Sequence, residues 1–387
     1  MNSRTPVRQA VRWILALLTV VLCSLAIRTV VVRISAYADS HESISTQWKT
    51  KVDEPACLAM SQGGRYFAAV DGEGTVQLYD NDGNLLWKQR VPGATDVLIA
   101  RNGESLLVYS RLDPHHQDVL FYKLNGRRLW NHRVDGTISS GAVSADGLYA
   151  AVTTQKRFVY LYWPDPNRPR FHRWRLDGIG RTVAFTPDKS WIVAGMREPS
   201  GISCFDLDAK LRWSCRNDSE RAYDLQTSAD GRTILGLAPA NQQNPGMNLC
   251  LWNADGKELW KRKLLGFDGR ALVSPQSQYV AVSYADYLSH GKSEFLERKV
   301  SVYNASGQLL WEKGGLFFGP RLIALSPKGT SVICWDGKDA LFNINSSGRI
   351  LSKMILGGQI KKVISSDDGK RILLYCSDGW MYLLNVG

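Results

Sequence analysis

The sequence predicts an all-β protein, an eight-bladed β-propeller that follows one N-terminal transmembrane helix. Three observations support this fold class. A tryptophan recurs at intervals of 39 to 51 residues, a Ser/Asp/Gly/Pro turn followed by an apolar strand occurs eight times, and an apolar run lies near the N-terminus. Repeated four-stranded units of about 40 to 50 residues are typical of a propeller.

Each repeat is interpreted as four short strands, A to D. In the first unit the turn at 61–65 separates strands A and B, strand C covers 76–79, and strand D covers 85–87 after a tight turn at 80–83. Glycine in that turn permits the positive φ that such a hairpin needs. An eighth unit has Ser352 in place of tryptophan. The seven tryptophans are Trp48, Trp87, Trp130, Trp174, Trp213, Trp260 and Trp311.

The two ends of the repeat are complementary. Trp48 has no strands A to C before it, and the last unit ends after its strand C. We therefore expect residues 44–52 to complete the final blade beside 358–387, so that the propeller covers 44–387. Such closure leaves no free sheet edge between the first and last blades.

The N-terminal region predicts a signal-anchor. Residues 13–27 carry no charge, and the apolar run continues to Val32 with Arg28 as its one charged residue. About 20 apolar residues are enough for a helix to cross a membrane. Three arginines within 1–12 precede the run, which predicts a cytoplasmic N-terminus and an extracytoplasmic propeller. The expected organisation is a tail at 1–12, a transmembrane segment at 13–33 and a linker at 34–43.

A cleaved signal peptide is the alternative for this region. The apolar run is also compatible with the hydrophobic core of a signal sequence, and Ala36-Tyr37-Ala38 has the A-x-A form of a cleavage site. Cleavage would release the propeller as a periplasmic or secreted protein. Both alternatives place the propeller outside the cytoplasm.

Strand D repeatedly follows a Gly-x-x-x-Trp pattern. Its instances are 83–87, 126–130, 256–260 and 307–311. This pattern resembles the tryptophan-docking repeat of the PQQ-like, quinoprotein-type β-propeller superfamily, and the resemblance covers residues 44–387. It implies that the seven repeat tryptophans dock between neighbouring blades. The WD-repeat family is a weaker match, because no Gly-His opens a repeat and no Trp-Asp closes strand C.

The superfamily contains quinoprotein dehydrogenases and non-catalytic scaffolds, among them the propeller subunit of the outer-membrane protein assembly machinery. The dehydrogenases use vicinal cysteines, an acidic base and calcium ligands around the central channel. This chain has no adjacent cysteines. The resemblance therefore favours the scaffold branch, and we predict a protein that is not an enzyme, with no catalytic, metal-binding or cofactor-binding residues.

Long connections between strands B and C predict the partner-binding surface. They cover 111–117 in blade 2, 238–247 in blade 5 and 285–298 in blade 6. Blades 5 and 6 are neighbours, so their connections should form one surface, as is common for binding loops on a rigid scaffold. The predicted contact residues are Tyr287, Leu288, Phe295, Leu296 and Arg298. A neutral insertion is the alternative.

Two further features involve charge and cysteine. The net charge of +12 favours anionic partners, and a basic cluster in blade 3 could contact anionic lipid or polymer or simply protect an edge strand from pairing. That cluster is Arg168, Arg170, Arg173 and Arg175. Cys204 and Cys215 flank the C–D turn of blade 4, where an exported location would permit a disulfide.

The sequence therefore predicts a membrane-anchored, extracytoplasmic propeller that acts as a protein-interaction scaffold in the cell envelope. Its expected partners are envelope proteins and, through the N-terminal helix, the membrane; no nucleic acid is expected. The alternative is a quinoprotein-like oxidoreductase or a ligand-binding sensor that uses the central channel.

Overall fold

The computed structural model describes eight stretches of the chain, and the predicted tail, transmembrane segment and linker lie outside them. The described stretches are 44–111, 116–163, 170–198, 200–216, 224–239, 246–286, 298–314 and 321–387. The chain divides into two compact units at Glu42 and Ser43, and the second unit carries the described residues. Its regular elements are strands, apart from a short 3-10 turn at Gln62–Gly64.

The described residues form eight four-stranded antiparallel sheets, which confirms the predicted eight-bladed propeller. Blade 1 contains β2 (Pro55–Met60), β3 (Tyr66–Asp71), β4 (Thr75–Asp80) and β5 (Leu85–Arg90). Blade 2 contains β6 (Ala94–Ile99), β7 (Ser105–Ser110), β8 (His116–Lys123) and β9 (Arg128–Asp135). Blade 3 contains β10 (Ile138–Val143), β11 (Ala150–Thr154), β12 (Phe158–Trp163) and β13 (Arg170–Arg175). Blade 4 contains β14 (Ile179–Phe185), β15 (Trp191–Arg197), β16 (Gly201–Asp206) and β17 (Leu211–Arg216).

The next three blades repeat this order and the last blade takes a strand from each end of the repeat. Blade 5 contains β18 (Asp224–Thr227), β19 (Thr233–Pro239), β20 (Met247–Asn253) and β21 (Glu258–Leu264). Blade 6 contains β22 (Gly266–Val273), β23 (Tyr279–Asp286), β24 (Arg298–Asn304) and β25 (Leu309–Lys313). Blade 7 contains β26 (Arg321–Leu325), β27 (Ser331–Trp335), β28 (Ala340–Asn345) and β29 (Ile350–Ile355). Blade 8 contains β30 (Ile360–Ser365), β31 (Arg371–Cys376), β32 (Trp380–Val386) and β1 (Ile44–Lys51).

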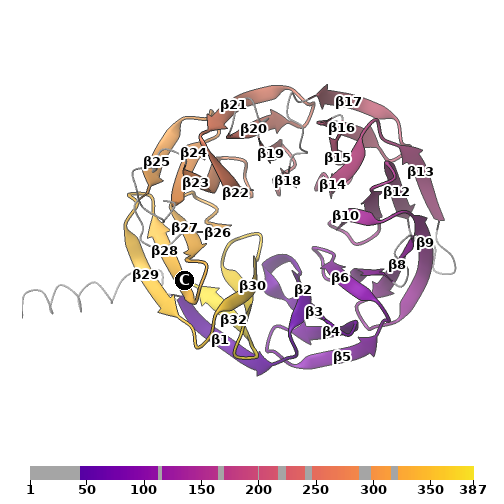
Figure 1. Cartoon of the computed structure of the whole chain (residues 1–387), viewed down its shortest axis with the longest axis horizontal. Coiled ribbons are helices and arrows are strands. Elements are labelled where there is room, and N and C mark those ends of the chain that lie inside the picture. Colours follow the sequence, from indigo (N-terminus) through magenta and orange to yellow (C-terminus); the bar gives the residue numbers. More distant parts are fainter. Residues whose placement is uncertain are drawn as a thin grey trace, which may run out of the picture. The chain divides into compact units, whose positions relative to one another are not determined.

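The predicted closure is confirmed by the register of blade 8. β1 pairs antiparallel with β32, from Ile44 opposite Val386 to Lys51 opposite Trp380. Figure 1 shows the first strand of each blade near the centre of the ring and the fourth strand at the rim, with β1 beside β32. The sheet that closes the ring thus joins residues more than 300 positions apart in the chain.

The hydrophobic core lies between the faces of adjacent blades. One cluster joins Val70 and Leu78 of blade 1 to Val97, Leu106 and Val108 of blade 2, and all five side chains are buried. The second strands are covered on both faces, and every residue of β7 is buried. Such strands are largely apolar in sequence because neither face contacts water. This explains why the apolar runs indicated the repeat in the sequence.

Tryptophans from the rim strands dock onto the next blade at four junctions. The indole nitrogens donate hydrogen bonds of 2.6 to 3.1 Å to carbonyl oxygens in the C–D turn of that blade. The donor–acceptor pairs are Trp48–Asn81, Trp87–Leu124, Trp213–Ala254 and Trp260–Ala305. At each of these four junctions the glycine of the Gly-x-x-x-Trp pattern lies against the ring, and a Cβ on it would be 3.2 Å or less from an indole atom. Glycine therefore serves both the turn and the docking.

The junction between blades 3 and 4 departs from this pattern. Ala209, with φ of +64°, occupies the turn position that glycine takes elsewhere. Among the described residues the indole nitrogen of Trp174 has no hydrogen-bond partner. Trp174 packs instead against Phe205, with ring centroids 5.3 Å apart. The indole nitrogen of Trp311 likewise has no hydrogen-bond partner among the described residues, although Gly348 occupies the corresponding turn position in blade 7, so this difference in docking is not confined to the alanine turn.

In six of the eight blades the rim strand carries a β-bulge one residue before the tryptophan. In blade 1, Leu78 is opposite Trp87 while Tyr79 is opposite Leu85, so Leu86 has no partner. The same shift leaves Leu259 and Leu310 unpaired in blades 5 and 6. These three leucines are 45%, 45% and 46% exposed. A β-bulge changes the direction in which a side chain points. The same bulge therefore directs the tryptophan ring toward the next blade and the preceding leucine toward solvent.

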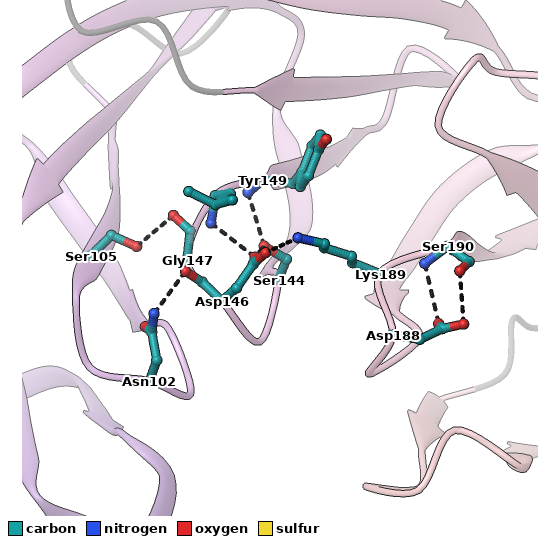
Figure 2. A network of polar contacts seen from close by, with 10 residues as sticks. Asn102, Ser105, Ser144, Asp146, Gly147, Tyr149, Asp188, Lys189 and Ser190 are labelled. Carbon is teal, nitrogen blue, oxygen red and sulfur yellow. Dashed lines mark hydrogen bonds and ion pairs between the residues drawn. The ribbon is translucent and has the colours of Figure 1, made fainter.

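The A–B turns form a belt of polar contacts between blades (Figure 2). Asp146 of blade 3 accepts hydrogen bonds from Ser144 within its own turn and from Lys189 of blade 4. Asn102 of blade 2 donates to the Asp146 backbone carbonyl at 2.7 Å, and Ser105 donates to that of Gly147 at 3.0 Å. The turns therefore fix neighbouring blades to one another on this face of the ring.

Candidate functional site

The face opposite the A–B turns carries the three long B–C connections predicted from the sequence. They join β7 to β8, β19 to β20 and β23 to β24, in blades 2, 5 and 6. Four of the predicted contact residues, Tyr287, Leu288, Phe295 and Leu296, lie outside the described residues. The fifth, Arg298, is described as the first residue of β24, and its side chain is only 11% exposed.

Arg298 is held by a bulge in the innermost strand of its own blade. The pairing of β22 with β23 shifts between Phe267 and Arg270, so Asp268 and Gly269 have no partners in the register. Asp268 adopts φ of +51°, an uncommon backbone conformation for a residue other than glycine. Arg298 donates to the Asp268 backbone carbonyl at 2.9 Å and also contacts the carboxylate. The bulge thus places a carboxylate over a buried guanidinium.

Gly269 permits this bulge to pack against blade 5. A Cβ at Gly269 would lie 2.6 Å from Sδ of Met247 and 3.0 Å from a methyl carbon of Leu237. Both neighbours are buried in the cluster between blades 5 and 6. A glycine is therefore required where the channel wall meets this cluster.

Two further arginines and a second carboxylate line the same cavity of about 480 Å³, between blades 5, 6 and 7. Arg321, the first residue of β26, has a guanidinium nitrogen 3.5 Å from the Asp268 carboxylate. Its guanidinium carbon also lies 5.6 Å from the ring centroid of Trp335, within cation–π range. Arg270 comes from the wall of the central channel, and Asp224 from the start of β18. We call these five charged residues, with Trp335, the arginine pocket.

Protein surroundings disfavour positive charge in the arginine pocket. Burial, together with the nearby charge of Arg321, lowers the pKa of Arg298 to about 10. Arg270 is open to channel solvent, yet desolvation by the channel wall still lowers its pKa, and the charge of Asp224 opposes that effect. Three guanidinium groups therefore share two carboxylates in a partly desolvated space.

Of the residues in the arginine pocket, only Arg298 was predicted from the sequence. A signal did exist, because Asp224 and Arg321 are charged residues at the starts of inner strands. These two residues are 97 positions apart, however, and no local pattern connects them. The ring brings them together, since neighbouring blades contribute their inner strands to one channel.

The basic cluster of blade 3 lies on the free rim strand, as predicted. Arg170, Arg173 and Arg175 are exposed residues of β13, while Arg168 lies outside the described residues. The guanidinium carbon of Arg173 lies 4.7 Å from the ring centroid of Phe158. These side chains are spread along one strand edge and line no described cavity. The geometry fits protection of an edge strand at least as well as anion binding.

The predicted Cys204–Cys215 disulfide is absent, and both residues are free cysteines. The register of β16 and β17 is the reason, because Cys204 lies opposite Trp213 and Cys215 lies opposite Ile202. The two cysteines therefore occupy diagonal positions rather than facing ones, and diagonal spacing is too long for a disulfide. Burial raises the pKa of both thiols, that of Cys204 to about 12.

The other end of the channel contains a second cavity of about 500 Å³, lined by inner strands of blades 2 to 8. Arg101 of blade 2 and Asp367 of blade 8 form an ion pair of 2.6 Å at its edge. Both residues belong to A–B turns. Because blade 1 lies between blades 8 and 2, the ion pair spans blade 1. Within the part of the chain that the structure describes, no group of three His, Cys, Asp or Glu side chains could hold a metal ion.

The described residues also include no helix with the length and apolarity that crossing a membrane requires.

Comparisons with known proteins define the class of fold. No family model matches the sequence, and no curated protein matches it either. Among solved structures, the C-terminal WD40 domain of Sif2 aligns with a TM-score of 0.68 and 11% identity, over 90% of this chain and 99% of that one. BamB from Moraxella catarrhalis aligns with a TM-score of 0.63 and 16% identity, over 88% and 99%.

A third similar structure, hydrazine synthase from Kuenenia stuttgartiensis, aligns with a TM-score of 0.57 and 13% identity, over 89% of this chain and 98% of that one. At these identities the likeness shows the propeller fold alone, since one fold hosts many unrelated functions.

Proposed function

We propose that this protein is a protein-interaction scaffold of the cell envelope that binds its partner through the B–C face of blades 5 and 6. One observation carries the proposal: the arginine pocket lies on the same face as the long connections of these two blades. A closed ring with docked blades is rigid, and rigid scaffolds commonly bind through such connections. The likeness to WD40 and BamB propellers is compatible with this role.

The proposal includes the membrane anchor, the extracytoplasmic location, a place in the non-catalytic branch of the PQQ-like superfamily and the absence of a chemical step. Residues 13–33 would anchor the chain, with residues 1–12 in the cytoplasm. The Gly-x-x-x-Trp pattern and the four docked tryptophans support the superfamily.

The membrane topology is tested with a reporter enzyme that is active only outside the cytoplasm. The reporter is fused after residue 43 in one protein and after residue 387 in another. Inactive fusions at both positions would contradict it.

Binding is tested by cross-linking in cells, followed by purification of the detergent-solubilised full-length protein. One variant replaces residues 287–297 by a short Gly-Ser turn. The matched control replaces residues 112–115 of blade 2, which belong to a B–C connection on the same face but in a distant blade. We expect protein partners to be retained by the parent and the control and lost from the blade 6 variant. A parent without any cross-linked protein partner would contradict the scaffold function.

A further inference from the structure

Among the described residues, the lining of the arginine pocket contains more positive charge than negative charge. Its described charged residues are Asp224, Asp268, Arg270, Arg298 and Arg321. Arg298 and Arg321 both approach the same oxygen, Oδ2 of Asp268. Arg270 makes no hydrogen bond to a described residue and interacts electrostatically with Asp224. One guanidinium charge is therefore left without a carboxylate of its own.

The geometry of the pocket suits an incoming anion. Its volume of about 480 Å³ falls within the usual range for a ligand site. Arg321 is 49% exposed and Asp268 is 53% exposed, so the pocket is accessible from solvent. Stacking on Trp335 restricts Arg321, which reduces the conformational entropy that binding has to remove. A guanidinium also offers the paired N–H groups that match a carboxylate.

The charge balance distinguishes between kinds of anion. For the described lining residues the surplus is a single positive charge, which one carboxylate would neutralise. A phosphate group carries up to about two negative charges at neutral pH. Its second charge would be repelled by Asp224 and Asp268, which line the same pocket. The pocket is therefore better matched to a carboxylate than to a phosphate.

We propose that the arginine pocket binds an aspartate or glutamate side chain from an acidic segment of the protein partner, with Arg270 and Arg321 as its ligands. The proposal rests on the proposed scaffold function and names the chemistry of the partner. Arg298 positions Asp268 and does not contact the bound carboxylate, because its own donors already reach Asp268. Arg298 begins β24 directly after the long connection of blade 6, so the pocket lies at the end of the blade where the proposed partner docks.

The test measures binding of a short fluorescein-labelled peptide of alternating Glu and Gly to the detergent-solubilised full-length protein, by fluorescence anisotropy. A peptide with Gln in place of Glu is the matched ligand control. The variants are Arg270→Gln and Arg321→Gln. Arg232→Gln is the matched protein control, because Arg232 is 81% exposed in the A–B turn on the opposite face and its loss changes the net charge equally. Thermal unfolding of each variant confirms that the ring is intact.

We expect the Glu peptide to bind and the Gln peptide not to bind. Arg270→Gln and Arg321→Gln should each raise Kd about tenfold, as expected for the loss of a hydrogen bond to a charged group. Arg232→Gln should leave Kd unchanged, and added salt should weaken binding. Equal Kd values for the parent and both pocket variants would overturn the proposal, as would equal binding of the Gln peptide.

Succinate and inorganic phosphate identify the source of the anion. We expect both to displace the peptide only at concentrations far above its Kd. Displacement by succinate near the peptide Kd would instead assign the pocket to a free small carboxylate and overturn the partner assignment. Efficient displacement by phosphate alone would overturn the carboxylate chemistry. If cross-linked partners persist equally with Arg270→Gln and Arg321→Gln, this inference fails while the scaffold function stands.

Discussion

The indole nitrogen of Trp48 donates a hydrogen bond of 3.0 Å to the backbone carbonyl of Asn81, and this contact joins blade 8 to blade 1. Gln47 donates to the same carbonyl at 3.0 Å. Arg371, from β31, donates at 3.0 Å to the carbonyl of Gly64 in the first A–B turn. The junction that closes the ring thus has contacts at both turns of blade 1, and it supports the following predictions.

Alanine at Gly83 should destabilise the ring more than alanine at Gly379. Both glycines have φ near +82° to +83°, so both substitutions carry the same backbone cost, about 1 kcal/mol. A Cβ at Gly83 would be 2.8 Å from the Trp48 ring, whereas one at Gly379 meets no atom within 4 Å. We expect Gly83→Ala to lower the free energy of unfolding by about 1 to 3 kcal/mol more, as overpacking does. Urea unfolding measures the free energy of unfolding of both variants. Equal decreases for Gly83→Ala and Gly379→Ala would contradict docking of Trp48 at this turn.

Removal of β1 should prevent stable closure. A chain that begins at residue 53 lacks the strand that pairs with β32, and it lacks Trp48. The edge of β32 would then be free to pair with other chains. We expect this truncation to aggregate or unfold without a cooperative transition, while a chain that begins at residue 43 unfolds cooperatively. Circular dichroism during heating, with light scattering, distinguishes the two. A cooperative transition at the same temperature in both would refute the role of β1.

Asp146 should matter more to stability than its ion-pair partner Lys189. Asp146 accepts hydrogen bonds from Ser144 and from the Leu148 backbone within its turn, in addition to the contact with Lys189. Burial alone would raise the pKa of Asp146, but these donors outweigh it and lower the pKa. Asp146→Ala should cost about 1 to 2 kcal/mol because the turn loses several bonds.

Lys189→Ala should cost less than Asp146→Ala, since an exposed ion pair contributes little. The matched measurement is the urea midpoint of the two variants beside the parent. A larger loss for Lys189→Ala would show that the contact between blades, rather than the turn, is the main role of Asp146.

The stability of the protein should fall in alkali partly because of Cys57. Burial raises the pKa of its thiol to about 11 from an ordinary value of 9.0, an effect that a backbone hydrogen bond at Val97 opposes and the charge of Asp96 increases. Above pH 9.0 the unfolded thiol loses its proton while the folded one keeps it. The unfolded state then binds fewer protons, so the free energy of unfolding falls as pH rises from 9.0 to about 11.

Cys57→Ala should reduce this alkaline loss. The readout is the difference in the free energy of unfolding between the parent and Cys57→Ala across that pH range, because most tyrosines with raised pKa values contribute equally to both proteins. Tyr109 is an exception, since the charge of Cys57 helps to raise its pKa. Parallel curves would show that the Cys57 thiol does not couple to folding.

The fold could be predicted because its signals are local and repeated. The second strands are mostly apolar and largely buried, and the C–D turns of five blades contain a glycine of positive φ. The closure by residues 44–52 was also predictable, because an incomplete unit at one end matched an incomplete unit at the other. The cysteine prediction failed for a physical reason. It assumed that the two cysteines face each other, whereas the tight turn at 206–210 leads to a register in which Cys204 lies opposite Trp213 and Cys215 opposite Ile202.

The sequence by itself determined the number of blades, the order of the strands, the docking tryptophans and the face that bears the long connections, since each depends on neighbours in the chain. The tertiary structure decided the arginine pocket. Asp224, Arg298 and Arg321 come from three different blades, and Asp268 reaches Arg298 only because a bulge turns its backbone to a positive φ. Closure of the ring converts residues with no local relation into a single charged cavity.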